Sequence, residues 1–90
     1  MSIVELINER QILVYPNPFS ESTTVYFGEG LSENCSLQIV DLLGNQVYFL
    51  DRIIGNSIEI QGSTFNAGVY ILIVQDSATS EIYTKKLVVN

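Results

Sequence analysis

The chain has 90 residues, with ten acids against four bases and a net charge of −6. This length fits one domain, in which folding buries about 60–65% of the surface of the unfolded chain. The acidic balance disfavours nucleic-acid binding, because neutralising phosphates requires a basic face. No apolar run approaches the roughly 20 residues of a membrane-spanning helix, so we expect no membrane insertion.

The composition also argues against catalysis. The chain has no histidine, no tryptophan and one cysteine, so a serine or thiol nucleophile would lack a base to activate it. The sequence contains no cluster of metal ligands and no glycine-rich phosphate loop. We therefore expect no enzymatic activity and no metal or other cofactor. Cys35 is expected to be a small buried hydrophobe, because in a strand it shares a face with Leu37 and Ile39.

The first eleven residues differ from the rest of the chain. The apolar residues from Ile3 to Ile7 are interrupted by an acid, with neither a basic leader nor a small-residue cleavage site. The segment is therefore not a secretion signal; a helical turn, or a linker that ends in an edge strand, both fit its pattern. We assign residues 1–11 to a linker or to an added start of the chain, and residues 12–90 to a single folded domain.

Short β-branched runs separated by turn residues predict an all-β domain. The expected strands are Ile12–Tyr15, Thr23–Phe27, Cys35–Asp41, Gln46–Asp51, Ser57–Gln61, Val69–Gln75 and Ile82–Val89. Such strands, at a spacing of roughly 10–12 residues, fit a seven-stranded antiparallel β-sandwich of the immunoglobulin-like type. Almost no helix is expected after Tyr15.

Alternation of apolar and polar residues indicates which side chains enter the core. The run Val69–Val74 is apolar on both faces, which predicts a central strand covered on both sides. If Tyr70 is buried there, its hydroxyl group needs a partner. The predicted core residues are Leu37, Ile39, Ile58, Ile60 and Leu72. The acids expected on solvated turns and edges are Glu21, Glu29, Glu33, Asp41, Asp51, Glu59, Asp76 and Glu81.

The first motif in chain order is Tyr15-Pro16-Asn17-Pro18-Phe19. Each proline lacks a backbone donor and biases the residue before it to extended geometry, so the strand ladder must stop here. Phe19 is then able to cover an open edge of the core. The motif can be a plain exit from the strand, a recognition element, or both.

Two turn motifs follow. Asp41-Leu42-Leu43-Gly44-Asn45-Gln46-Val47 predicts a tight hairpin, in which Gly44 takes a positive φ and the Asp41 side chain caps the turn. The ligand spacing of a calcium loop is missing, which favours a turn over a metal site. Asn66-Ala67-Gly68-Val69-Tyr70 predicts a turn that opens the central strand, with Gly68 serving the fold.

The last motif is Lys85-Lys86 followed by Leu87-Val88-Val89. Adjacent residues of a strand point to opposite faces, so at most one lysine faces the core, and it would sit at an open edge. Lysines on an edge strand can block aggregation. They can equally form a basic mark beside an apolar strand that a receptor recognises by strand addition. The residues leave both interpretations open.

In this order and near these distances, the four motifs resemble the C-terminal sorting domain of proteins exported by the bacterial type IX (Por) secretion system. That family shows a Tyr-Pro-Asn-Pro opening, an Asp-x-x-Gly turn, a Gly-Val-Tyr strand and a Lys-rich apolar end. The resemblance runs from about Val14 to Asn90. The sorting-motif candidates that it implies are Tyr15, Pro16, Asn17, Pro18, Gly44, Gly68, Tyr70, Lys85, Lys86, Leu87, Val88 and Val89.

The resemblance implies an export signal at the C-terminus of a passenger protein. The passenger would cross to the periplasm, engage the outer-membrane translocon and reach the cell surface or the medium. A sortase-like peptidase would cut in Ile3–Gln11, the only candidate linker. We accordingly expect the chain to be the end of a longer exported protein, with Met1 added for expression.

Two other functions remain possible from the residues alone. A fibronectin-like or carbohydrate-binding sandwich module is the main alternative. It is weaker because sugar platforms usually need a row of exposed aromatic rings, and the chain has no tryptophan. A purely structural spacer would explain the fold, but it would not explain the ordered motifs.

Overall fold

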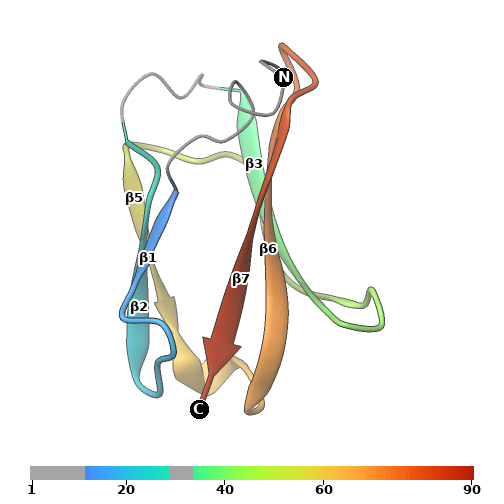
Figure 1. The fold of residues 1–90 in the computed structure, drawn as a ribbon. Coiled ribbons are helices and arrows are strands. Elements are labelled where there is room, and N and C mark those ends of the chain that lie inside the picture. Colours follow the sequence, from blue (N-terminus) through green and yellow to red (C-terminus); the bar gives the residue numbers. More distant parts are fainter. Residues whose placement is uncertain (1–11, 29–33) are drawn as a thin grey trace, which may run out of the picture.

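The computed structural model describes residues 12–28 and 34–90, which form two antiparallel sheets packed face to face (Figure 1). The three-stranded sheet has the order β1-β2-β5 and consists of β1 (Leu13–Tyr15), β2 (Ser22–Tyr26) and β5 (Ser57–Gln61). The four-stranded sheet has the order β4-β3-β6-β7 and consists of β3 (Cys35–Asp41), β4 (Gln46–Leu50), β6 (Gly68–Asp76) and β7 (Ile82–Val89).

The predicted seven-stranded immunoglobulin-like sandwich is confirmed, and no strand end differs from its expected position by more than one residue. The only helical element in the described part of the chain is one 3-10 turn, η1 (Gly62–Thr64). No helix there is long and apolar enough to cross a membrane. Turn residues at regular intervals thus sufficed to divide the chain into its strands.

The core lies between the two sheets, where every second residue of a strand points inward. The fully buried residues include Val25, Phe27, Cys35, Leu37, Ile39, Leu72, Val74 and Leu87. Of the predicted core residues, Leu37, Ile39, Ile60 and Leu72 are buried, whereas Ile58 is only partly buried. Ile58 lies near the start of β5, an edge strand, and therefore packs at the margin of the core.

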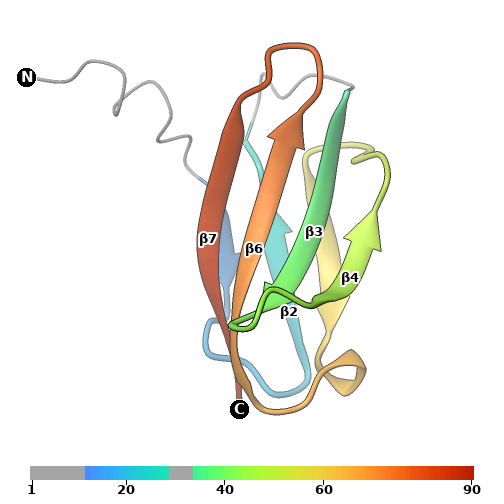
Figure 2. The same cartoon turned by 90° about the vertical axis from the view of Figure 1, so that its right-hand side faces the viewer.

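The prediction that β6 is covered on both sides is wrong. Its inner face is buried, but Ile71 and Ile73 on the outer face are half-buried and Val69 is 37% exposed. No described element lies over this face, which Figure 2 shows from the front. Neighbouring side chains of the same sheet give partial cover, since Ile71 pairs with Val40 on one side and Lys86 on the other.

Asp76 was expected on a solvated turn, and this prediction is also wrong. Asp76 is 5% exposed, and its carboxylate accepts a hydrogen bond of 2.9 Å from the Ala78 amide. Its backbone amide donates to the Glu81 carbonyl at 2.9 Å, and its carbonyl accepts from the Ser80 amide at 2.7 Å. The acid is buried because it closes the turn between β6 and β7.

Gly62 allows a close approach between η1 and the loop that precedes β2, at the point where the chain leaves β5. Its amide donates to the Glu21 carbonyl at 2.7 Å. A Cβ atom on this residue would collide with the carbonyl oxygen of Ser20, which belongs to the backbone and cannot rotate away. Only glycine therefore permits this approach between η1 and the loop that precedes β2.

Candidate sorting surface

The Tyr15–Phe19 loop and the end of β7 lie side by side, although about 70 residues separate them in the chain (Figure 1). The side-chain amide of Asn17 donates to the Lys86 carbonyl at 3.0 Å, and its oxygen accepts from the Val88 amide at 2.9 Å. An asparagine side chain offers both a donor and an acceptor. Asn17 thereby fills the place of one residue of an added strand beside β7.

Phe19 continues this pairing with backbone atoms. Its amide donates to the Val88 carbonyl at 3.1 Å, and its carbonyl accepts from the Asn90 amide at 2.8 Å. Phe19 and Val89 form an isolated parallel bridge. The Phe19 ring is 2% exposed and belongs to the core, as expected.

The same loop is also fixed to the three-stranded sheet. The Thr23 hydroxyl group, on the buried face of β2, donates to the Pro16 carbonyl at 2.6 Å. Both X-Pro bonds of the loop, before Pro16 and before Pro18, are cis. Through its hydrogen bonds to Thr23 of β2 and to the end of β7, the loop connects the two sheets. Sequence reasoning missed Thr23, which no local signal distinguishes from other strand threonines.

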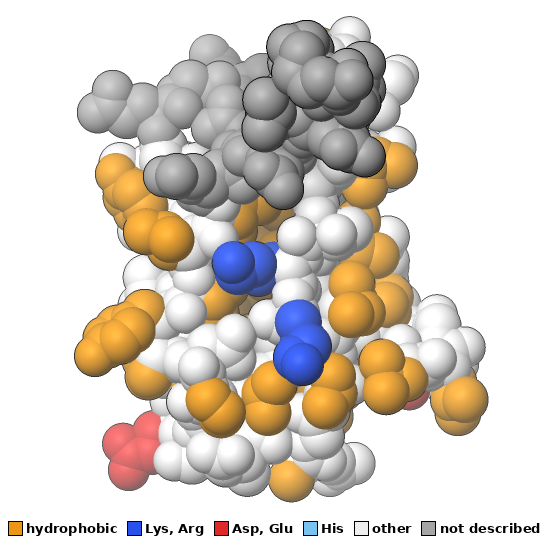
Figure 3. Space-filling model, viewed as in Figure 1, with side chains coloured by type: hydrophobic (Ala, Val, Ile, Leu, Met, Phe, Trp, Pro, Cys, Tyr) orange, Lys and Arg blue, Asp and Glu red, His pale blue; other side chains and the backbone are white. Residues whose placement is uncertain are grey.

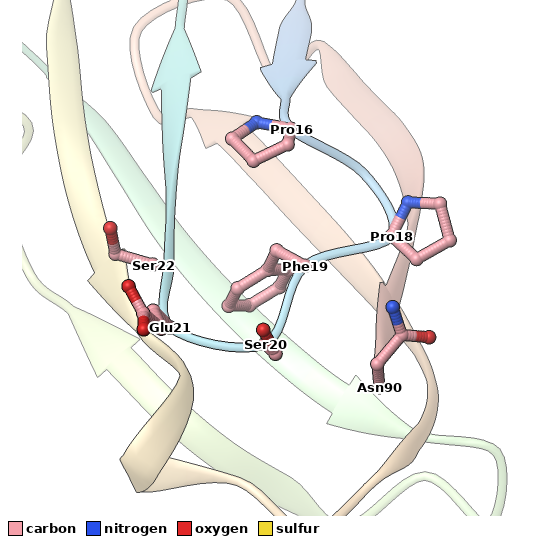
Figure 4. Close-up of a pocket in the computed structure, with 7 residues that line it drawn as sticks. All are labelled: Pro16, Pro18, Phe19, Ser20, Glu21, Ser22 and Asn90. Atoms are coloured by element: carbon pink, nitrogen blue, oxygen red, sulfur yellow. The ribbon is translucent and has the colours of Figure 1, made fainter.

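An open pocket of about 390 Å³ lies beneath the loop. Figure 4 shows Pro18 and Asn90 at one end of it and Glu21 and Ser22 at the other. Within residues 12–28 and 34–90, no group of three histidine, cysteine or acidic residues could hold a metal ion. The pocket is therefore lined both by residues of the Tyr15–Phe19 loop and by Asn90, which follows β7.

Lys85 and Lys86 lie on opposite faces of β7, as the sequence predicted. Lys85 is opposite Leu72 on the core-facing side, and Lys86 is opposite Ile71 on the outer face. Both lysines are nevertheless exposed, because β7 is an edge strand. Figure 3 shows basic side chains in the middle of this side of the molecule, with apolar side chains on either side of them.

The Asp41 motif forms the expected hairpin between β3 and β4. Gly44 has φ 90°, and one Asp41 carboxylate oxygen accepts from the amides of Leu43 and Asn45, both at 2.9 Å. The hydrogen bond from the Asn45 amide is the main cause that lowers the pKa of Asp41 below its usual value. All these contacts serve the turn, which agrees with the interpretation of this acid as a cap.

The Asn66–Tyr70 motif also serves the fold. The Tyr70 hydroxyl group donates to the Asn66 carbonyl at 2.6 Å, so the buried ring has the partner it needs. This contact resembles the tyrosine corner of immunoglobulin-like sandwiches. The ring of Phe65 packs against Tyr70 with their centroids 5.3 Å apart. Gly68 pairs with Val89 and so lies beside the end of β7.

All four motifs meet at one end of the sandwich. Asp41 pairs with Tyr70, and Tyr70 pairs with Leu87. The next residue, Val88, bonds to Asn17 on the other side of β7. One row across the four-stranded sheet therefore contains a residue from three of the motifs, and Asn17 of the fourth motif lies beside the end of this row.

Comparison with known proteins gives a family and a fold. A sequence model described as the secretion system C-terminal sorting domain matches residues 13–90. Among solved structures, the chain is similar to PorZ, an essential bacterial surface component of the type-IX secretion system of Porphyromonas gingivalis. The TM-score is 0.72 at 23% sequence identity, over 99% of this chain and 12% of the PorZ chain. Comparison with curated proteins gives no match. The chain belongs to the family of C-terminal sorting domains of the type IX (Por) secretion system.

Proposed function

We propose that this domain directs an N-terminal passenger protein across the outer membrane through the type IX translocon. The observation that supports this best is the convergence of the four motifs at one end of the sandwich. Family membership supplies the sorting role. The arrangement of side chains suggests a surface that a receptor binds, and the domain itself performs no catalysis in this proposal.

In this proposal the passenger and its domain pass through the periplasm and reach the cell surface or the medium. A sortase-like peptidase cuts ahead of the domain, in Ile3–Gln11, which lies outside the described residues. Residues 1–11 then serve as the linker. We call the Tyr15–Phe19 loop and the end of β7 the motif surface. The translocon would bind its exposed parts, above all Lys85 and Lys86, because Leu87 and Val89 are buried.

The carbohydrate-binding alternative is not favoured. Tyr15 is 80% exposed and Tyr26 is 40% exposed, and both lie on the outer face of the three-stranded sheet. Phe49, at 52% exposed, lies on the outer face of the other sheet. These rings are divided between opposite faces and form no continuous platform on which a sugar chain would stack.

The test is export of a reporter that reaches the periplasm of a host with this secretion system. A fusion to Ser2–Asn90 should appear at the surface or in the medium, whereas a fusion ending at Thr84 should remain in the periplasm. Truncation also removes buried residues of β7, so Lys85→Ala/Lys86→Ala is needed to separate recognition from folding. Both lysines are exposed, and neither forms an ion pair with another described residue.

Arg52→Ala is the matched control, because Arg52 is an exposed base outside the motif surface. We expect it to leave export unchanged. Equal export of the intact fusion, the truncated fusion and the double lysine variant would refute the proposed role of this surface.

A further inference from the structure

β7 forms one edge of the four-stranded sheet. Within the described sandwich β7, with 8 residues, is the longest of the edge strands, ahead of β4 and β5 with 5 each and β1 with 3. An edge strand presents backbone amides and carbonyls that a further strand can pair with. Native proteins usually shorten, cover or charge such edges. Whether each part of the β7 edge is covered, charged or open therefore indicates where a further strand could bind.

The outward-pointing groups of β7 belong to alternate residues. The contacts of the motif loop identify them as the Lys86 carbonyl, both backbone groups of Val88 and the Asn90 amide. By the same alternation, the amides of Thr84 and Lys86 and the carbonyls of Ile82 and Thr84 point outward as well.

Asn17 divides this edge into two halves. From the Lys86 carbonyl onward, the edge is closed by Asn17 and Phe19. From Ile82 to the Lys86 amide, none of the outward groups has a hydrogen-bond partner among residues 12–28 and 34–90. The open half is therefore a short, defined stretch of edge, and a strand bound there would end at the side chain of Asn17.

The charges of the open half indicate the chemistry of its partner. Lys85 lies on the core-facing side and Lys86 on the outer face, so each face of an added strand would have a lysine beside it. Neither lysine is neutralised by a described acid. The domain as a whole carries a charge of −6, which disfavours a second copy as the partner through like-charge repulsion.

We propose that an extended segment of another protein, with carboxylate side chains on both of its faces, adds to β7 along Ile82–Lys86. The backbone hydrogen bonds provide affinity, and the carboxylates beside Lys85 and Lys86 provide specificity. This inference rests on the proposed function, in which that protein belongs to the export machinery.

Thr84→Pro is the sharpest test, because it removes one outward amide and no hydrogen bond within the described domain. Proline is tolerated in an edge strand when its missing amide faces solvent. Thr84→Val is the matched control, since it keeps the amide and the strand propensity. In the reporter fusion we expect the Val variant to be exported normally. The Pro variant should be exported about tenfold less, as expected when a bound strand loses backbone pairing.

Circular dichroism and thermal melting establish whether both variants are folded. A folded Thr84→Pro fusion exported as efficiently as Thr84→Val would overturn the strand-addition site while leaving the sorting role intact. Failure of the unaltered fusion to be exported would instead overturn the proposed function. If Thr84→Pro does not fold, Lys85→Glu/Lys86→Glu decides between the outcomes. Normal export of this charge-reversed variant overturns the inference, and loss of export, with Lys85→Arg/Lys86→Arg still active, supports it.

Two measurements on the purified domain complete the test. In hydrogen exchange the amides of Thr84 and Lys86 should exchange rapidly, and strong protection of either would show that this half of the edge is already paired. Sedimentation should give a monomer. A dimer that Thr84→Pro dissociates would show that a second copy occupies the site, against the proposed partner.

Discussion

Single polar side chains hold the turns and loops of this domain by bonding to backbone groups, either within the same turn or in a distant segment. Asn17, Thr23, Asp41 and Tyr70 each provide at least one such hydrogen bond. The reason is physical: where a strand ends, its amides and carbonyls lose their ladder partners and need others. These four side chains therefore determine where the turns and loops that they bond to are fixed.

The close approach at Gly62 leads to a stability prediction. Gly62→Ala places a methyl group against the Ser20 carbonyl, which belongs to the backbone and cannot rotate away. We expect a loss of about 1–3 kcal/mol in the free energy of unfolding, as is typical for overpacking. Urea denaturation measures this value. Ser63→Ala, at the exposed neighbouring position, is the control. Equal stability of the two variants would show that the loop can move away without cost.

The hydrogen bonds to Asp41 lead to a pH prediction. Because they lower its pKa in the folded state, Asp41 stabilises the domain above the pKa of the unfolded state, near the ordinary value of 3.8. This contribution is lost as the pH falls through the folded-state pKa. Melting temperatures measured from about pH 6 to about pH 2 should therefore fall less steeply for Asp41→Asn than for the unaltered domain. Parallel curves would contradict the assignment.

At the scale of the element, strands were predictable because their signals are local. β3, β5 and β7 have the bounds expected from β-branched runs and turn residues. The outer face of β6 was misjudged because Ile71 and Ile73 are apolar without being covered by another layer. A single sequence does not distinguish an apolar residue that is buried from one that neighbouring side chains only partly shield.

The contacts of the motif residues were likewise predictable only where they are local in the sequence. The turn at Gly44 was predicted, and so was the need of the Tyr70 hydroxyl group for a partner if the ring is buried; these contacts span at most four residues. The pairing of Asn17 with Lys86 and Val88 could not, because it joins segments separated by 69 and 71 residues. Proline positions indicated where the ladder stops, but they gave no information about what the next residue would bond to.

The role of Asn17 at the edge of β7 leads to a prediction for amide exchange. Asn17→Ala removes the acceptor of the Val88 amide, so its protection should fall by about tenfold, as the loss of one hydrogen bond implies. The amides of Lys85 and Leu87 point toward β6 and should keep their protection. Nuclear magnetic resonance measures each amide separately. A general loss of protection throughout β7 would mean that Asn17 supports the whole strand rather than one bond.

At the scale of the whole molecule, one thin core between two sheets determines stability. Ile60→Ala removes a side chain that is 1% exposed and should cost about 2–5 kcal/mol. That is a large part of the roughly 5–15 kcal/mol available to a domain. Ile54→Ala is the control, because Ile54 is 79% exposed. Similar melting temperatures for the two variants would show that the register of β5 is wrong.

The contact between Asn17 and Val88 also makes the motif surface depend on complete folding. Asn17 lies in the loop after β1 of the three-stranded sheet, and Val88 lies in β7 of the four-stranded sheet, so this contact exists only when the two sheets lie together. Closing a contact over such a separation along the chain costs more loop-closure entropy than closing a local turn. In the proposed role, a receptor that binds the loop and β7 together would therefore recognise the folded conformation of the domain as well as its sequence, and it would not bind an unfolded chain.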